Sequence, residues 1–331
     1  MAKARALDKR RKSVRNIRKI TRTMELVATA QFKKAMDLAV NADAYTKKIV
    51  EFVHDLAQSG EKLSHPLLVE RKKPIEDKDV VLLVLSANRG MCGGFNSGVI
   101  RLASQRLLHL QKDYHGVSLE VSGKRGISAF KFKKQTLTNE YLDLQDKPQL
   151  EQIEELAESY LERFLAGEID RLDICYTKFD SISRQYAVIE TILPIAELTE
   201  KGDVNAVKDD VEADLKKAAL MKKADTITAE GKDKGVAALK KKSGNIQFDL
   251  LPSAEDILEE LIPKSFRAKL FKCFLDSAVG EQIARMVAMK AATENADGMI
   301  KMLTTAYNRA RQSQITNEIT EIISGADALS N

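Results

Sequence analysis

The chain has 331 residues, of which 31% are charged and 44% are hydrophobic, and its formal net charge is +5. Only 5% of the residues are aromatic and Trp is absent, which excludes an aromatic stacking platform as the main functional surface. The three cysteines are odd in number and far apart, so they fit a reducing compartment and give no metal-binding spacing. No apolar run approaches the ~20 residues of a transmembrane helix, and the N-terminus has no apolar signal core.

Residues 1–59 predict one long helix. They contain neither proline nor glycine, the two residues that most often end a helix. From about residue 8 to 58 apolar residues recur in alternating steps of three and four, and this 3.5-residue period is typical of a coiled coil. The predicted seam is Val14, Ile17, Thr21, Met24, Ala28, Gln31, Ala35, Leu38, Ala42, Tyr45, Ile49, Phe52 and Leu56.

The start of this helix is strongly basic. Residues 1–24 hold ten Lys and Arg side chains against the single acid Asp8, which leaves a charge of +9. Such a segment either stays solvated or meets an acidic partner. Nucleic acid, anionic lipid and an acidic protein surface are all open on this evidence.

Residues 60–197 predict a Rossmann-like α/β domain. Strand-like and helix-like segments alternate along it, and this order is typical of a mostly parallel sheet. We expect strands at 80–85, 117–121, 172–177 and 185–193, and helices at 97–111 and 149–165.

A glycine-rich turn at 86–96 follows the first of these strands, where nucleotide-binding folds hold phosphate. No Lys-Ser or Lys-Thr follows the glycines, and the spacing of Gly90, Gly93 and Gly94 is not the dinucleotide fingerprint. We interpret the segment as a tight turn that uses the backbone freedom of glycine. The four histidines form no metal spacing and no catalytic triad is suggested, so we expect no catalytic residue, no metal and no cofactor.

The last part of the chain predicts a charged insertion followed by a second long helix. Residues 198–245 hold eleven lysines and nine acids but no aromatic residue. Residues 246–264 predict a return to the α/β domain, with a strand at 246–251 and a short helix ending at Leu261. Residues 265–331 predict the second helix, so the two terminal helices indicate an antiparallel coiled coil with the α/β domain at its base. An intermolecular coiled-coil dimer stays the alternative at this point.

Three blocks of sequence, 18–28, 89–96 and 285–296 continued in 307–326, resemble the gamma subunit of rotary F-type ATP synthases, in the order of that family. The resemblance implies a non-catalytic central-stalk rotor subunit whose terminal helices form a shaft inside a hexamer of alternating alpha and beta subunits. It implies that the α/β domain contacts the epsilon subunit and the c-ring of the membrane sector, and that proton flow turns ring and shaft. It also implies a peripheral membrane protein on the cytoplasmic face of a bacterial cell membrane, with no nucleic-acid partner and no transmembrane segment of its own.

The resemblance further implies which residues contact the alpha/beta hexamer. Polar contacts are expected from Arg311, Gln312, Thr316 and Glu318, basic and methionine contacts from Arg22 and Met24, and apolar contacts from Ile315, Ile319, Ile322 and Ile323. Plastid gamma subunits carry an insertion with a regulatory cysteine pair near the same place. The insertion here contains no cysteine, which excludes thiol switching through it.

The alternative function is a basic coiled-coil protein that binds nucleic acid or acts as a scaffold. It would explain the basic N-terminal segment. It would not explain the alanine-rich C-terminal helix with its mixed charges, and the sequence has no recognisable nucleic-acid-binding module.

Overall fold

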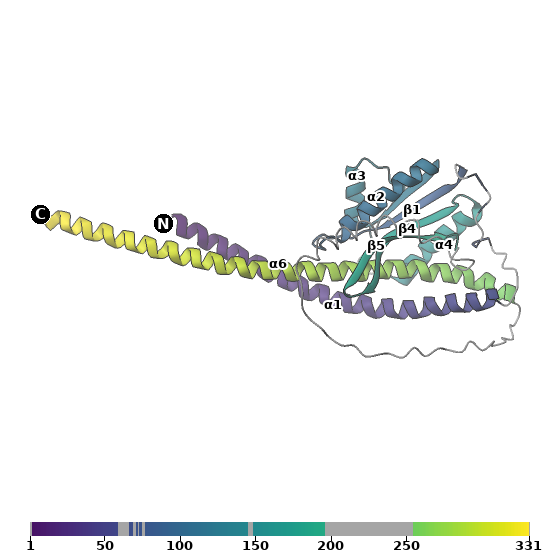
Figure 1. Cartoon of the computed structure of the whole chain (residues 1–331), viewed down its shortest axis with the longest axis horizontal. Coiled ribbons are helices and arrows are strands. Elements are labelled where there is room, and N and C mark those ends of the chain that lie inside the picture. The colour runs from purple at the N-terminus through teal and green to yellow at the C-terminus, as the bar shows by residue number, and fades with distance from the viewer. Residues whose placement is uncertain are drawn as a thin grey trace, which may run out of the picture.

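The computed structural model describes residues 2–58, 66–68, 71, 73–74, 77–144, 148–195 and 254–330. The predicted insertion at 198–245 and the predicted strand at 246–251 therefore lie outside the described residues. The described chain has two parts, a rod of two long helices and an α/β domain beside one end of the rod (Figure 1). We call the rod, α1 and α6, the shaft, and the α/β domain, β1–β5 with α2–α4, the foot.

The shaft is built by the two ends of the same chain. Helix α1 spans Ala2–Gln58 and helix α6 spans Ala254–Ser330. They run antiparallel, and both termini lie at the end of the rod that is far from the foot (Figure 1). The last turns of α6 continue past the start of α1. The predicted intramolecular coiled coil is therefore confirmed.

The seam of the shaft differs from the predicted one at alternate positions. Ile17 and Leu38, both predicted to face the partner helix, are each 52% exposed. The structure instead turns Phe32 and Ala39 inward, and Ala39 packs in a cluster with residues of α6. Starting at Thr21, the observed seam follows alternating steps of four and three residues along the helix. The predicted seam started from the same residue with a step of three and then one of four. Both series share Thr21, Ala28, Ala35 and Ala42, so the α1 pattern alone fits either choice.

Helix α6 starts earlier than predicted. We expected a short helix ending at Leu261 and a new one from Ser265, but one helix runs from Ala254 through Pro263. A proline inside a helix removes one hydrogen bond and crowds the preceding turn. Ile262 and Phe266, on either side of Pro263, are buried in the core of the foot. Their burial offsets the lost hydrogen bond, because each large apolar side chain contributes about 1.5–3 kcal/mol when it leaves water.

The foot is one mostly parallel sheet with the strand order β3-β2-β1-β4-β5. Strand β5 alone is antiparallel, to β4, and the other neighbours are parallel. The strands are β1 Asp79–Leu85, β2 Gly116–Ser122, β3 Asn139–Tyr141, β4 Arg171–Ser181 and β5 Arg184–Leu193, and the helices are α2 Phe95–Asp113, α3 Lys124–Phe132 and α4 Leu150–Ala166. All four predicted strands and both predicted helices are present, and the sequence missed the short elements α3 and β3.

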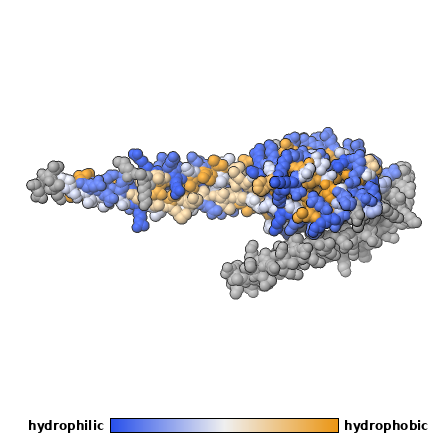
Figure 2. Space-filling model, turned by 90° about the horizontal axis from the view of Figure 1, so that it is seen from above, coloured by the Kyte–Doolittle hydropathy of each residue, from blue (hydrophilic) through white to orange (hydrophobic). Residues whose placement is uncertain are grey.

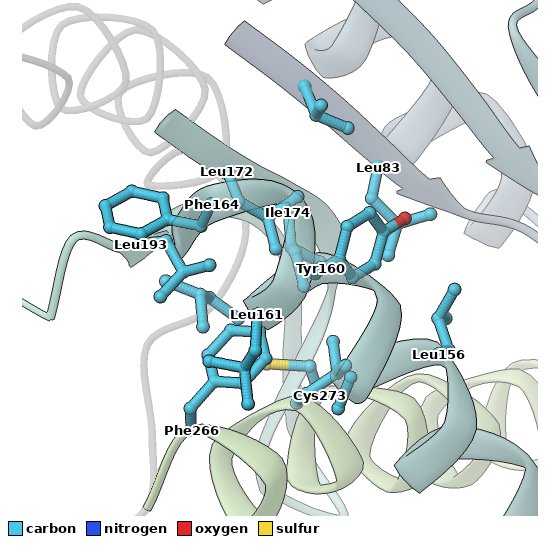
Figure 3. Packing of buried hydrophobic residues seen from close by; sticks show 14 of the residues in the cluster. Leu83, Leu156, Tyr160, Leu161, Phe164, Leu172, Ile174, Leu193, Phe266 and Cys273 are labelled. Atoms are coloured by element: carbon cyan, nitrogen blue, oxygen red, sulfur yellow. The ribbon is translucent and has the colours of Figure 1, made fainter. Parts of the chain in front are cut away.

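The sheet buries both faces. Alternate side chains of β1 enter different clusters, with Val80 and Leu82 toward α2 and α3 and with Val81 and Leu83 toward α4 and α6. Figure 3 shows the second cluster, where Phe266 and Cys273 of α6 pack with side chains of α4, β1, β4 and β5. Helix α6 is therefore at once half of the shaft and one layer of the foot.

Helix α6 also fills the place where such sheets usually bind ligands. In open α/β sheets, that place is the crevice at the carboxyl ends of the strands where the strand order reverses. Here Ala87, Cys92 and Phe95, which follow β1, form a buried cluster against Ala284 of α6. A Cβ atom on Gly280 of α6 would lie 3.0 Å from Cγ2 of Thr177 in β4. The contact is this close because glycine lets the helix approach the sheet.

The glycine-rich segment at 86–96 is a tight turn, as predicted from the sequence. It packs against α6. Gly93 has a φ of +55°, which favours glycine, and its nearest non-local neighbours are Ala284 and Ala288 of α6. Gly94 has an ordinary φ of −85° and precedes the first residue of α2. Left-handed backbone freedom is therefore required at Gly93 and not at Gly94.

Candidate partner-contact surface

Two polar side-chain contacts join the two helices of the shaft. The Thr293 hydroxyl donates to the Thr21 hydroxyl across the buried seam, with 2.8 Å between the oxygens. Nearer the tip, Nε of Arg18 lies 2.5 Å from the Asp297 carboxylate. The buried hydroxyl pair specifies register, because a shift would leave it unsatisfied, whereas the Arg18–Asp297 pair is about half exposed and contributes little. The shaft is therefore held in one longitudinal alignment.

The shaft leaves many large apolar side chains exposed. On α1 they include Ile17 and Ile20, at 52% and 58% exposure, and on α6 they include Met302 at 67%. None of these residues is among the contact residues predicted from the sequence. The signal available for Ile20 was its place as a large apolar residue outside the predicted seam, whereas Ile17 belongs to that seam. The others are Leu26, Val27, Leu38, Val40, Val287 and Met299.

The predicted apolar contacts near the C-terminus are exposed. Ile315 is 42%, Ile319 is 52% and Ile322 is 72% exposed, and Ile323 is 56% exposed. The spacing of 315, 319 and 322 places three of them on one side of the helix. Ile315, with which the stripe begins, lies beside Ala4 and Arg5 near the start of α1.

The predicted polar contacts on α6 are also exposed. The Thr316 hydroxyl donates to the backbone carbonyl of Gln312 at 3.1 Å, and the Glu318 carboxylate accepts from Gln314 at 2.8 Å. Both hydrogen bonds stay within the helix, so Thr316 and Glu318 are presented in fixed positions. Arg311 and Gln312 lie one turn closer to the foot.

Arg311 stands at a positively charged groove between the two helices. Arg311 and Ile315 of α6 line it together with Arg5, Lys9 and Lys12 of α1. One acid, Asp8, lies among them and accepts hydrogen bonds from Arg11 at 2.6 Å and from Lys12 at 3.0 Å. The bonds from Lys12 and then Arg11 lower the pKa of Asp8, so it stays ionised at neutral pH. The groove still carries a net positive charge.

Arg22 and Met24 occupy another level of the shaft. Arg22 is exposed and donates to Glu25 at 2.7 Å, while Met24 is half-buried at the seam. They lie beside the Thr21–Thr293 contact, and Arg311 is 18 residues farther along α6 than Thr293. At 1.5 Å per residue, the two levels are about 27 Å apart. The structure thus places the predicted contacts at two separate heights.

The described residues offer no metal centre and no membrane-spanning helix. No group of three or more His, Cys, Asp or Glu side chains in the described ranges is placed to hold a metal ion. None of the described helices is long and apolar enough to cross a membrane. All three cysteines are buried, and burial raises the pKa of Cys92 above its ordinary value.

Comparison with known proteins then identifies the family. The sequence model of a family described as ATP synthase matches residues 3–329. The chain is 48% identical over 329 residues to the ATP synthase gamma chain of Rhodopirellula baltica, which covers 99% of each chain. The chain belongs to the ATP synthase gamma chain family. The gamma chain of Leptospira biflexa is 36% identical over the full length of both chains.

Chains of similar fold occur in solved structures of ATP synthase assemblies. A chain in the structure of the Euglena gracilis mitochondrial ATP synthase (OSCP/F1/c-ring, rotational state 3) has a TM-score of 0.58 at 16% identity and covers 99% of this chain and 95% of its own. A chain of the rotor from the same organism has a TM-score of 0.54 at 17% identity, covering 95% and 99%. At these identities the likeness shows the fold alone.

Family membership confirms the predicted identity as the central-stalk gamma subunit of an F-type ATP synthase, a membrane-associated complex. It also confirms that the chain is a non-catalytic subunit of this complex. The alternative of a nucleic-acid-binding or scaffold coiled coil has no support among the relatives of this gamma chain.

Proposed function

We propose that this gamma chain transmits rotation from a c-ring in the membrane to the catalytic sites of an alpha/beta hexamer through the exposed surface of its shaft. The observation that carries the proposal is the row of large apolar side chains on a rod that no described part of the chain covers. Soluble proteins rarely expose apolar surface in this way unless a partner covers it. A sleeve of surrounding subunits is such a partner.

The exposed residues suggest two kinds of contact with the hexamer. The stripe of Ile315, Ile319 and Ile322 suits an apolar collar around the end of α6, where the rod is a single helix. The groove at Arg311 suits acidic segments of the beta subunits, because partly desolvated charge pairs are stronger than solvated ones. Gln312, Thr316 and Glu318 add hydrogen-bonding groups on the same turns, and Arg22 and Met24 add a second level of contact about 27 Å nearer the foot.

Transmission of torque also requires a stiff connection between shaft and foot. Helix α6 is continuous from the core of the foot to the tip, so no loop intervenes between the two parts. The close contact of Gly280 with Thr177, together with the Cys92–Phe95–Ala284 cluster, resists turning of α6 against the sheet. We infer that the foot receives force from the c-ring and the epsilon subunit on the cytoplasmic face of the cell membrane, with protons as the driving ion.

A reversible cross-link between the shaft and a beta subunit tests this function. Arg311→Cys places a thiol at the groove, and the three native cysteines are buried and so compete little for oxidation. In the complex with a cysteine on the facing beta segment, oxidation is expected to stop ATP turnover, and reduction is expected to restore it. Normal turnover by the cross-linked complex would refute the proposal.

The matched control carries the thiol on the foot. Ile182, in the turn between β4 and β5, is 58% exposed. Phe179, near this turn, packs with Leu275 and Val279 of α6, which lie more than 30 residues from Arg311 along that helix. Ile182→Cys with the same beta cysteine is expected to form no such link and to keep full turnover under oxidation. Equal inhibition in both variants would show that oxidation itself, and not the link to the shaft, stops the complex.

A further inference from the structure

One face of the foot carries an aromatic side chain that the core does not use. Phe132, the last residue of α3, is 90% exposed, more than any other large apolar side chain in the described part of the chain. Ile127 and Phe130 of the same helix are buried in the core. Helix α3 therefore packs against the core of the foot without Phe132. The core gives no reason for a phenylalanine at this position.

Exposed basic residues flank Phe132 in the sequence. Helix α3 contains Lys124, Arg125 and Lys131 and no acidic residue, and Lys133 and Lys134 follow it directly. Lys131 pairs with Glu140 at 2.6 Å. The remaining charge on this end of the foot is strongly positive and solvent-exposed.

Helix α2 extends the same surface. Nζ of Lys133 donates to the Ser104 hydroxyl at 2.7 Å, which ties the end of α3 to α2. Leu108, one turn beyond Ser104, is 57% exposed, and Arg101, one turn before it, is exposed as well. Figure 2, which views the foot from the side of α2 and α3, shows apolar side chains ringed by hydrophilic ones. We call this surface the α3 patch, made of Arg101, Leu108, Lys131, Phe132, Lys133 and Lys134.

We propose that the α3 patch is a docking surface for an acidic segment of another subunit in the assembled complex. An aromatic anchor within a ring of charged side chains is a typical hot spot of protein interfaces. The cationic rim favours a partner of negative charge and disfavours a basic one. The site is separate from the contacts along the shaft, so it does not depend on the rotary role of Arg311 or the C-terminal isoleucines.

An acidic protein segment fits the patch better than an anionic membrane does. A helix that lies on a membrane needs a continuous apolar face to bury among the lipids. The apolar face of α3 is already used inside the foot, and α3 has only nine residues. Phe132 and Leu108 offer two anchoring points, which suits a pocket in a protein.

Photocross-linking in the purified complete complex tests the proposal. Benzoylphenylalanine at position 132 keeps an aromatic side chain there and reacts with whatever covers it. The expected product joins this chain to an Asp- and Glu-rich peptide of another subunit. The yield should fall about tenfold in the Lys133→Glu/Lys134→Glu background and should decrease as salt rises, because exposed charges are screened within about 10 Å at 0.1 M salt.

The control is the same probe at position 182, another exposed apolar side chain of the foot, which is expected to give no such product. Thermal melting of each purified variant shows whether it is folded, and only folded variants enter the comparison. A yield at 132 no higher than at 182 would overturn the proposal. So would a cross-link to a peptide without acidic residues, an undiminished yield in the charge-reversed background, or a product with phospholipid.

Discussion

The foot and the shaft use their charged and apolar residues in opposite ways. In the foot, buried charges are satisfied from within, as at Asp173, whose carboxylate accepts hydrogen bonds from Arg106, Arg171 and Thr191 at 2.8–3.0 Å. In the shaft, small residues such as Ala28 and Ala39 fill much of the seam, while large apolar ones such as Ile20 and Met302 face outward. The foot is thus stabilised by contacts within the chain. The exposed apolar side chains of the shaft contribute to stability only when a partner covers them.

The largest effect on stability should come from a buried charge of the foot. Asp173→Ala leaves the guanidinium groups of Arg106 and Arg171 without their carboxylate, and we expect a loss of about 3–5 kcal/mol in the free energy of unfolding. Chemical denaturation of the purified chain measures it. The control Asp180→Ala removes an exposed partner of Arg184 and should cost at most about 1 kcal/mol. Equal losses would contradict the difference between buried and exposed pairs.

The junction of foot and shaft should be the next most sensitive place. Gly280→Val drives side-chain atoms into Thr177 and Phe95, and overpacking of this kind costs about 1–3 kcal/mol. Gly298→Val is the matched control, because nothing lies within 4 Å of a Cβ atom there. Thermal melting should show a clear loss for the first variant and little change for the second. A harmless Gly280→Val would mean that α6 is not clamped against the sheet.

Changes at the tip of the shaft should affect coupling and leave folding intact. Arg311→Ala with Gln312→Ala removes exposed side chains, so the melting temperature of the isolated chain should stay within about 2 °C. In the complete complex we expect ATP turnover to fall about tenfold, which corresponds to about 1.4 kcal/mol. Full, coupled turnover of this double variant would show that these two residues are not contact residues.

The smallest effect is expected from the charged insertion. We propose that residues 198–245 form a segment separate from the α/β domain, since they hold few large apolar residues for a core. Deleting 199–244 should change the free energy of unfolding by no more than about 0.5 kcal/mol and leave assembly with alpha and beta subunits intact. Failure of the shortened chain to assemble would show that the insertion is structural.

The long periodic elements of this fold could be predicted from sequence. The absence of proline and glycine defines α1, and the apolar runs define β1 and β4, because local composition decides these elements. The sequence could not show that helix α6 continues through Pro263, since that depends on the burial of Ile262 and Phe266 in a core formed by distant segments. It also missed β3, a three-residue edge strand whose pairing with β2 is its main support.

The contact surface was only partly predictable for a similar reason. The exposed residues near Arg311 followed from the family resemblance, and the structure places them on the surface. The inward turn of Phe32 and Ala39 in place of Gln31 and Leu38 depends on α6, whose Leu275 and Val279 pack at that level. Because the shared alanines fit either seam, only the partner helix decides which large apolar residues of α1 stay exposed.

The most direct test of the central claim is to watch the foot turn while the hexamer is held still. A probe attached through Ile182→Cys, with the alpha/beta hexamer fixed to a surface, reports the angle of the foot during ATP hydrolysis. If the shaft transmits torque, the probe rotates in one direction, stops when the Arg311→Cys link to a beta subunit is formed and resumes when the link is reduced. Steady ATP hydrolysis with a motionless probe would contradict it.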